Sequence, residues 1–270
     1  MEIIQSISEA KEILGSRKNL VLIPTMGNLH KGHQSLIEEG KGKGSLVVSI
    51  FVNPLQFGPN EDFKQYPRTI QSDLNKLEKI NCEFVFMPGN DFIDDIKNII
   101  APPIAKRLCG KSRPGHFDGV LSIINKIFDI IKPQVSFFGL KDYQQYILIK
   151  DFAKNYYPNM EIIGCPVIRE DDGLAMSSRN NLLSAEEREL APNLYRRLKW
   201  IQDNKDNYPI SDLVQRSLNF LELKNFTVEY LNIYDLVNLN EKNTFDKGAL
   251  IAVAAKIGSV RLIDNIICRN

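Results

Sequence analysis

The sequence predicts an α/β protein: a parallel sheet in the first part of the chain, followed by a smaller α+β domain. Two observations support this prediction. Short runs of β-branched or aromatic residues alternate with helical patterns through the first two thirds of the chain, and this alternation changes after about residue 180. The apolar run Leu46–Val52 is continuous rather than alternating. Such a run indicates a strand that is buried on both faces, as in a parallel sheet covered by helices.

Each element of the parallel sheet rests on a local pattern. The expected strands are Leu20–Pro24, Leu46–Val52, Cys82–Met87, Val135–Phe138 and Ile162–Ile168. The expected helices lie between these strands, at residues 33–40, 70–80, 119–131 and 143–155. In the third helix the apolar residues follow the i, i+3, i+4 spacing of one helix face.

The final part of the chain has a different pattern. Ser184 and Glu187 form a capping-box pattern that begins a helix, and a second helical stretch follows at 211–223. Runs typical of strands close the chain, at Thr227–Tyr234, Ala249–Ala255 and Val260–Ile263. A domain boundary is expected near residues 170–182, where the polar segment Arg169–Arg179 contains Gly173 and is typical of a loop or hinge. We therefore expect two domains, residues 1–175 and residues 176–270.

Composition limits the classes of partner. The chain has 34 Lys and Arg against 33 Asp and Glu, so its formal net charge is +1 and argues against nucleic-acid binding. The longest apolar stretch, Ala249–Ala255, is far shorter than the roughly 18 residues of a membrane span. The N-terminus lacks the basic and apolar regions of a secretory signal, so we expect a cytoplasmic protein. Four cysteines without a C-x-x-C pair predict neither a disulfide framework nor a zinc knuckle.

Two of the three histidines, His30 and His33, lie where an expected strand leads directly into a helix. Ligands of doubly wound sheets bind at this edge, and the amides of a new helix favour an anion there. Two imidazoles could donate hydrogen bonds to phosphate oxygens in a transition state. Two alternatives remain: ordinary capping or surface histidines, or a zinc site completed by His116.

Several motifs resemble known families. His30-Lys-Gly-His33 resembles the H-x-G-H signature of the nucleotidyltransferase superfamily, and Met176-Ser-Ser-Arg179 resembles its K-M-S-K-S loop. Further segments resemble the pantoate–β-alanine ligases, and the similarity covers essentially the whole chain. These segments are Phe51-Val-Asn-Pro-Leu-Gln-Phe57, Tyr66-Pro-Arg-Thr69, Arg113-Pro-Gly-His-Phe117, Phe138-Gly-Leu-Lys-Asp-Tyr-Gln-Gln145 and Arg261-Leu-Ile-Asp-Asn265.

The resemblance implies a reaction and an architecture. ATP would activate (R)-pantoate as a pantoyl adenylate with release of pyrophosphate, and β-alanine would then displace AMP to give pantothenate. A Rossmann-like catalytic domain, residues 1–175, would bind nucleotide and pantoate. Residues 176–270 would form a lid, usually within a homodimer. ATP is a substrate in this reaction, and Mg²⁺ accompanies its triphosphate.

The resemblance also implies residue roles. His33 matches the catalytic proton donor, and His30 would stabilise charge on the transferring phosphate. Gln56 and Gln145 match the pantoate-binding glutamines, with Gln56 also near the β-alanine site. The ATP-binding positions are Met26, Gly27, Asn28, Leu29, His30, Lys31, Gly32, His33, Gly139, Leu140, Lys141, Asp142, Ile168, Met176, Ser177, Ser178 and Arg179.

Some assignments stay open at this point. Leu140 stands where the family usually has Glu, so any polar role of that side chain is absent here. No metal ligand is assigned, although Asp73 is a weak candidate for Mg²⁺. Asn53 either lines the pantoate pocket or holds the turn that carries Gln56. The alternative functions are a nucleotidyltransferase that stops after nucleotide transfer and an RNA-binding module.

Overall fold

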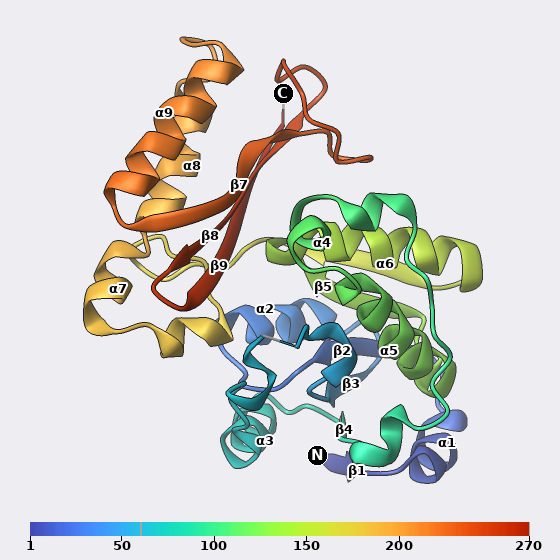
Figure 1. Ribbon diagram of the computed structural model, residues 1–270. Coiled ribbons are helices and arrows are strands. Elements are labelled where there is room, and N and C mark those ends of the chain that lie inside the picture. The colour runs from blue at the N-terminus through green and yellow to red at the C-terminus, as the bar shows by residue number, and fades with distance from the viewer. Residues whose placement is uncertain (60, 270) are drawn as a thin grey trace.

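The computed structural model describes residues 1–59 and 61–269 and contains two sheets (Figure 1). The first sheet has six parallel strands in the order β1-β4-β3-β2-β5-β6. Its strands are β1 (Glu2–Ile4), β2 (Leu20–Thr25), β3 (Ser45–Ile50), β4 (Phe84–Phe86), β5 (Val135–Gly139) and β6 (Glu161–Cys165). The chain runs outward from β2 on both sides, so β2 and β5 meet where the strand order reverses. Ligands bind at the carboxyl ends of strands at such a point.

Helices cover both faces of this sheet. They are α1 (Ile7–Gly15), α2 (Lys31–Gly40), α3 (Ile70–Lys79), α4 (Leu108–Ser112), α5 (His116–Ile131) and α6 (Tyr143–Tyr156). Leu20 and Leu22 of β2 pack with α1, α5 and α6, whereas Val21 and Ile23 pack with α2 and α3. Successive side chains of a strand point to opposite faces, which is why a continuous apolar strand serves both layers.

The second sheet is antiparallel and belongs to the end of the chain. Its strands β7 (Phe226–Tyr234), β8 (Ala249–Ile257) and β9 (Val260–Cys268) pair in sequence order. Helices α8 (Asn193–Asp203) and α9 (Ile210–Leu223) pack against it in a separate apolar core. The short helix α7 (Ala185–Leu190) begins with the capping box that Ser184 and Glu187 predicted. The whole architecture confirms the expected α/β class, with a Rossmann-like sheet and a smaller second unit.

Several element boundaries differ from the sequence-based expectation. The strand expected at Ile162–Ile168 ends at Cys165, because Pro166 cannot donate a ladder hydrogen bond. The strand expected at Val260–Ile263 continues to Cys268, since it pairs along its full length with β8. Strand β1 and helix α1 were not expected at all. None of the helices in the described part of the chain combines the length and hydropathy that crossing a bilayer requires.

Candidate active site

The turn between β2 and α2 is built on a buried carboxylate. Gly27 and Asn28 have positive φ angles of 79° and 49° and reverse the chain after the strand. The Asp73 side chain of α3, fully buried, accepts the backbone N–H groups of Asn28 and Leu29, both at 2.8 Å. It also accepts the Thr69 hydroxyl at 3.0 Å. These bonds make Asp73 the acceptor that shapes the turn, which gives this weak Mg²⁺ candidate a structural role.

His30 and His33 hold each other at the start of α2. The His30 side chain accepts the Gly32 N–H through Nδ1 at 3.1 Å, and His33 Nδ1 accepts the His30 N–H at 3.3 Å. A backbone N–H can only donate, so both Nδ1 atoms are acceptors and both protons lie on Nε2. The ring centroids are 4.1 Å apart. The capping interpretation is therefore confirmed, and both rings also line the cavity described below, with Nε2–H left as the ring donor.

Both imidazoles are neutral in this environment. Burial, followed by the charges of Lys141 and Lys76, lowers the pKa of His30 to about 4. Burial and the neighbouring His30 lower the pKa of His33 to about 3. Neutral rings with N–H donors can stabilise developing negative charge on a phosphate without first losing a proton.

Gln56 sits on a short 3₁₀ turn, η1 (Pro54–Gln56), that is docked on the start of α5. His116 Nδ1 lies 2.7 Å from the carbonyl oxygen of Gln56, to which Arg113 also donates at 3.2 Å. Asn53 caps the turn by accepting the Leu55 N–H, and its Nδ2 donates to the Gln56 side chain and to the Gly119 carbonyl. Asn53 therefore holds the turn and also contacts the glutamine.

His116 is excluded as a zinc ligand by the same contacts. Its Nδ1 faces a carbonyl and its Nε2 lies 3.0 Å from the Arg113 guanidinium, so both ring nitrogens already have hydrogen-bond partners. Burial, together with the Arg113 charge, lowers its pKa to about 4. Among the described residues there is no group of three or more His, Cys, Asp or Glu side chains placed to bind a metal.

The turn after β5 is η5 (Leu140–Asp142), and the second sheet holds it in place. Asn265 of β9 donates from Nδ2 to the carbonyls of Leu140 and Lys141, both at 2.9 Å. Beside it, Asp264 forms a bidentate ion pair with Arg169 at 2.7 and 3.0 Å. The Asn265 side chain therefore holds the backbone of this turn at Leu140 and Lys141 without a polar side chain at residue 140.

Two consecutive glutamines on α6 have different surroundings. Gln144 is buried, accepts the Cys109 N–H and donates to the carbonyls of Ile104 and Arg107. Gln145 instead faces the space between the two sheets and lines the cavity described below. Gln144 thus has a structural role, and of the two glutamines only Gln145 lines the smaller cavity.

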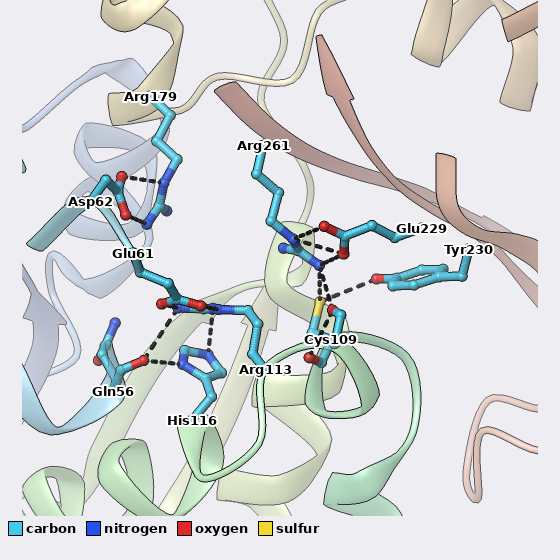
Figure 2. Close-up of polar contacts among 11 residues, drawn as sticks. Gln56, Glu61, Asp62, Cys109, Arg113, His116, Arg179, Glu229, Tyr230 and Arg261 are labelled. Carbon is cyan, nitrogen blue, oxygen red and sulfur yellow. Dashed lines mark hydrogen bonds and ion pairs between the residues drawn. The ribbon is translucent and has the colours of Figure 1, made fainter. Parts of the chain in front are cut away.

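The loop of residues 176–179 contacts two segments of the first unit, the turn after β2 and the segment that carries Asp62. Ser178 is buried and donates to the Asn28 carbonyl at 3.4 Å, and the Ser177 hydroxyl accepts the Arg179 N–H at 3.3 Å. The Met176 N–H donates to the carbonyl of Ile168, which closes a short hairpin beside the turn. Figure 2 shows the Arg179 guanidinium paired with Asp62.

These segments enclose a cavity of about 240 Å³ at the carboxyl edge of the sheet. It opens into a larger cavity of about 920 Å³, and Arg113, His116 and Lys141 line both. The predicted residues that line the smaller cavity are Met26, His30, Gly32, His33, Gln56, Gly139, Lys141, Asp142, Gln145, Ile168, Met176, Ser177, Ser178 and Arg179. Gly27, Asn28, Leu29, Lys31 and Leu140 are not among the lining residues.

The sequence reasoning did not assign roles to Glu61, Asp62 and Arg113, and it considered His116 only as a zinc ligand. These four residues form ion pairs and hydrogen bonds around Gln56 and Arg179 (Figure 2). The sequence offered one signal for these residues: two consecutive carboxylates, Glu61 and Asp62, lie between the family-like segments that end at Phe57 and begin at Tyr66. The positions of their arginine partners, 52 and 117 residues further along the chain, could not be read from that signal.

The parallel sheet, the ligand-binding edge and the imidazole and cationic groups around the cavity define a nucleotide-binding α/β enzyme. A family model described as Pantoate-beta-alanine ligase matches residues 2–267. This chain belongs to the pantoate-beta-alanine ligase family.

Individual relatives agree with this assignment. The chain is 42% identical over 257 residues to a pantothenate synthetase of Acinetobacter baumannii, with 93% of this chain and 91% of that protein covered. It is 40% identical to one of Thermotoga petrophila, with 99% of each covered.

Solved structures are similar throughout the chain. A crystal structure of pantothenate synthetase from Thermus thermophilus has a TM-score of 0.94 at 34% identity, covering 98% of this chain and 99% of that one. A pantoate-beta-alanine ligase from Francisella tularensis, complexed with beta-gamma ATP and beta-alanine, has a TM-score of 0.83 at 35% identity. It covers 99% of this chain and 97% of that one.

Proposed function

We propose that this protein condenses (R)-pantoate with β-alanine in an ATP-dependent reaction through a pantoyl adenylate. The observation that carries the proposal is one cavity in which phosphate-binding donors and two amide side chains meet. His30, His33 and Arg179 line this cavity and would be the phosphate-binding donors, and Gln56 and Gln145, which also line it, are the amides. The family membership and the relative complexed with ATP and β-alanine support the same reaction.

The first step is adenylation. A carboxylate oxygen of pantoate attacks the α-phosphorus of ATP, and the bond to the leaving pyrophosphate breaks. Gln56 and Gln145 would orient pantoate, because an amide both donates to and accepts from a molecule that carries hydroxyl and carboxylate groups. The Nε2–H groups of His30 and His33 would stabilise charge on the phosphate oxygens, and Lys141 would add a cation.

In the second step the neutral β-alanine amine attacks the activated carbonyl carbon, the bond to AMP breaks, and the nitrogen releases one proton to solvent. Mg²⁺ would enter as the magnesium complex of ATP, because the described residues offer no carboxylate cluster to hold it beforehand. His33 would act as a neutral donor rather than as an imidazolium acid in the free enzyme, since its low pKa leaves it without the second proton at neutral pH.

The proposal has three further parts that follow from the family resemblance. Residues 1–175 would bind ATP and pantoate, and residues 176–270 would act as a lid that shields the adenylate from water. The protein would be a cytoplasmic homodimer. Light scattering tests the last point, because a homodimer has twice the mass of one chain in solution.

Pyrophosphate exchange tests the reaction. With Mg²⁺ present, labelled pyrophosphate should enter ATP when pantoate is added and β-alanine is absent, because adenylation precedes any use of the amine. β-Alanine alone should support no exchange, and adding it with pantoate should yield AMP and pantothenate. Exchange that ignores pantoate would contradict the proposal. Nucleotide transfer without amide formation would instead favour a simple nucleotidyltransferase.

A further inference from the structure

Two consecutive carboxylates lie beside the site, on a segment that the proposed chemistry does not use. Glu61 and Asp62 stand at the start of the 3₁₀ turn η2 (Asp62–Lys64), between the turn that carries Gln56 and the buried Tyr66. Each carboxylate pairs with an arginine from a different part of the chain. Figure 2 shows both pairs, and all four of their residues line the larger cavity.

Asp62 forms a bidentate ion pair with one edge of the Arg179 guanidinium. Its two oxygens accept hydrogen bonds from Nε and Nη2, both at 2.8 Å. In the described chain no hydrogen bond engages Nη1, so the opposite edge stays available in the cavity that Arg179 lines. The Tyr66 ring lies 5.9 Å from the guanidinium carbon. A planar guanidinium held on one edge presents the other in a defined direction, which suits the oxygens of a phosphate.

Glu61 forms a bidentate ion pair with Arg113 in the same way. Its oxygens accept from Nε and Nη2, both at 2.6 Å. Burial would raise the pKa of Glu61, but the Arg113 hydrogen bonds and charge hold it below its usual value, so the carboxylate is ionised. The remaining donors of Arg113 reach His116 and the carbonyl oxygen of Gln56. Glu61 therefore acts on Gln56 through Arg113.

We propose that Glu61 and Asp62 are positioning residues with separate targets: Asp62 aims Arg179 at the phosphates of ATP, and Glu61, through Arg113, holds the Gln56 turn that faces pantoate. The inference rests on the proposed function, because it names what each arginine serves. Neither carboxylate needs to touch a substrate. Their adjacency couples the loop of residues 176–179 to the Gln56 turn through one short segment of the first unit.

The two targets predict separate kinetic effects. Asp62→Asn removes the charge and places an amide against a donor, so Arg179 loses its orientation. In pyrophosphate exchange the KM for ATP should rise about tenfold or more, as expected for loss of a charged hydrogen-bond pair, while the KM for pantoate stays within about twofold. Glu61→Gln should show the opposite pattern. Asp62→Glu, which keeps the charge, should recover part of the loss.

A double-mutant cycle separates positioning from a general structural effect. If Asp62 acts through Arg179, adding Asp62→Asn to an Arg179→Gln variant should change the KM for ATP no further. Asp203→Asn is the control for the same Asp-to-Asn change, because Asp203 pairs with Lys199 on the exposed surface of α8 and lines neither cavity. The control should leave both KM values unchanged. Additive effects of the two variants, or equal rises in both KM values for Asp62→Asn, would overturn the inference.

Direct binding distinguishes failure of the inference from failure of the proposed reaction. Calorimetric titration with ATP and Mg²⁺ needs no pantoate, and Asp62→Asn should weaken ATP about tenfold there as well, whereas Glu61→Gln should not. If the wild type binds ATP but shows no pantoate-dependent exchange, the proposed reaction fails while the Asp62 inference is still tested by titration. If Asp62→Asn does not fold, Asp62→Glu serves in its place, with a smaller loss of ATP affinity expected. Unchanged ATP affinity in a folded Asp62→Asn protein would refute the role.

Discussion

The three histidines should all stay neutral from pH 8 down to about pH 5.5. Burial lowers the pKa of His30 and His116 to about 4 and that of His33 to about 3, against 6.5 for a free imidazole. At pH 6.5 only about 0.3% of His30 rings would carry a second proton, where a free ring would be half protonated. The chain has no other histidine, so its imidazole spectrum should contain three sets of ring signals, one from each histidine.

Nuclear magnetic resonance of ¹⁵N-labelled rings measures both protonation and tautomer. His30 and His33 should appear as Nε2–H tautomers, because their Nδ1 atoms accept backbone N–H groups. His116 should appear as the Nδ1–H tautomer, since Nδ1 faces the carbonyl of Gln56. A signal from His30 or His33 that titrates near pH 6.5, or shows the Nδ1–H tautomer, would refute the assigned role as a neutral donor.

The same shifts predict how stability depends on pH. The folded-state pKa values lie below the unfolded value, so the unfolded chain takes up protons first as the pH falls. Stability is therefore fully present above about pH 6.5 and declines as the pH falls toward about 4. Between pH 7 and pH 5 each buried imidazole should cost about 2 kcal/mol of unfolding free energy. Denaturant titrations at both pH values should show this difference reduced by about 2 kcal/mol in His116→Asn. An unchanged difference would contradict the burial of a neutral ring there.

Three further substitutions test the site. The His33→Asn side chain can still accept the His30 N–H but offers no donor at the Nε2 position. The rate of pyrophosphate exchange should therefore fall roughly 10²–10³-fold with folding intact. A wild-type exchange rate would exclude catalysis by His33. Asp73→Ala leaves the N–H groups of Asn28 and Leu29 without their acceptor. Denaturant titration should then show a free energy of unfolding lower by about 2–6 kcal/mol. A loss below about 1 kcal/mol would contradict the role of Asp73 in the turn. Leu140→Glu should keep exchange within about threefold of wild type, because β9 holds the backbone at Leu140 rather than its side chain; a collapse with intact folding would show that the apolar side chain is required.

Much of the fold was readable from local pattern. The strands β2, β3 and β5 and helices α2, α3, α5 and α6 lie within a few residues of their expected positions, because each carries its own apolar periodicity. Strand β1, with only three residues, has too little periodicity to identify. The full length of β9 was hidden because its polar residues Asp264 and Asn265 interrupt the strand pattern. Those two residues are buried at the junction with the first unit. There Asp264 accepts hydrogen bonds from Arg169, and Asn265 donates to the backbone of the η5 turn.

The sequence by itself determined most of the strands and helices from β2 onward, the position of the histidine pair at a strand end, and the motifs that resemble the ligase family. These features depend on residues close together in the chain, whose spacing can be read directly. Only the tertiary structure showed which distant residues bind each other. Asp73 accepts hydrogen bonds from the turn before His30, and Asp62 pairs with Arg179, which lies 117 residues further along the chain. Ion pairs and buried hydrogen bonds depend on distance in space and on exclusion of water. The spacing of residues along the chain specifies neither of these conditions.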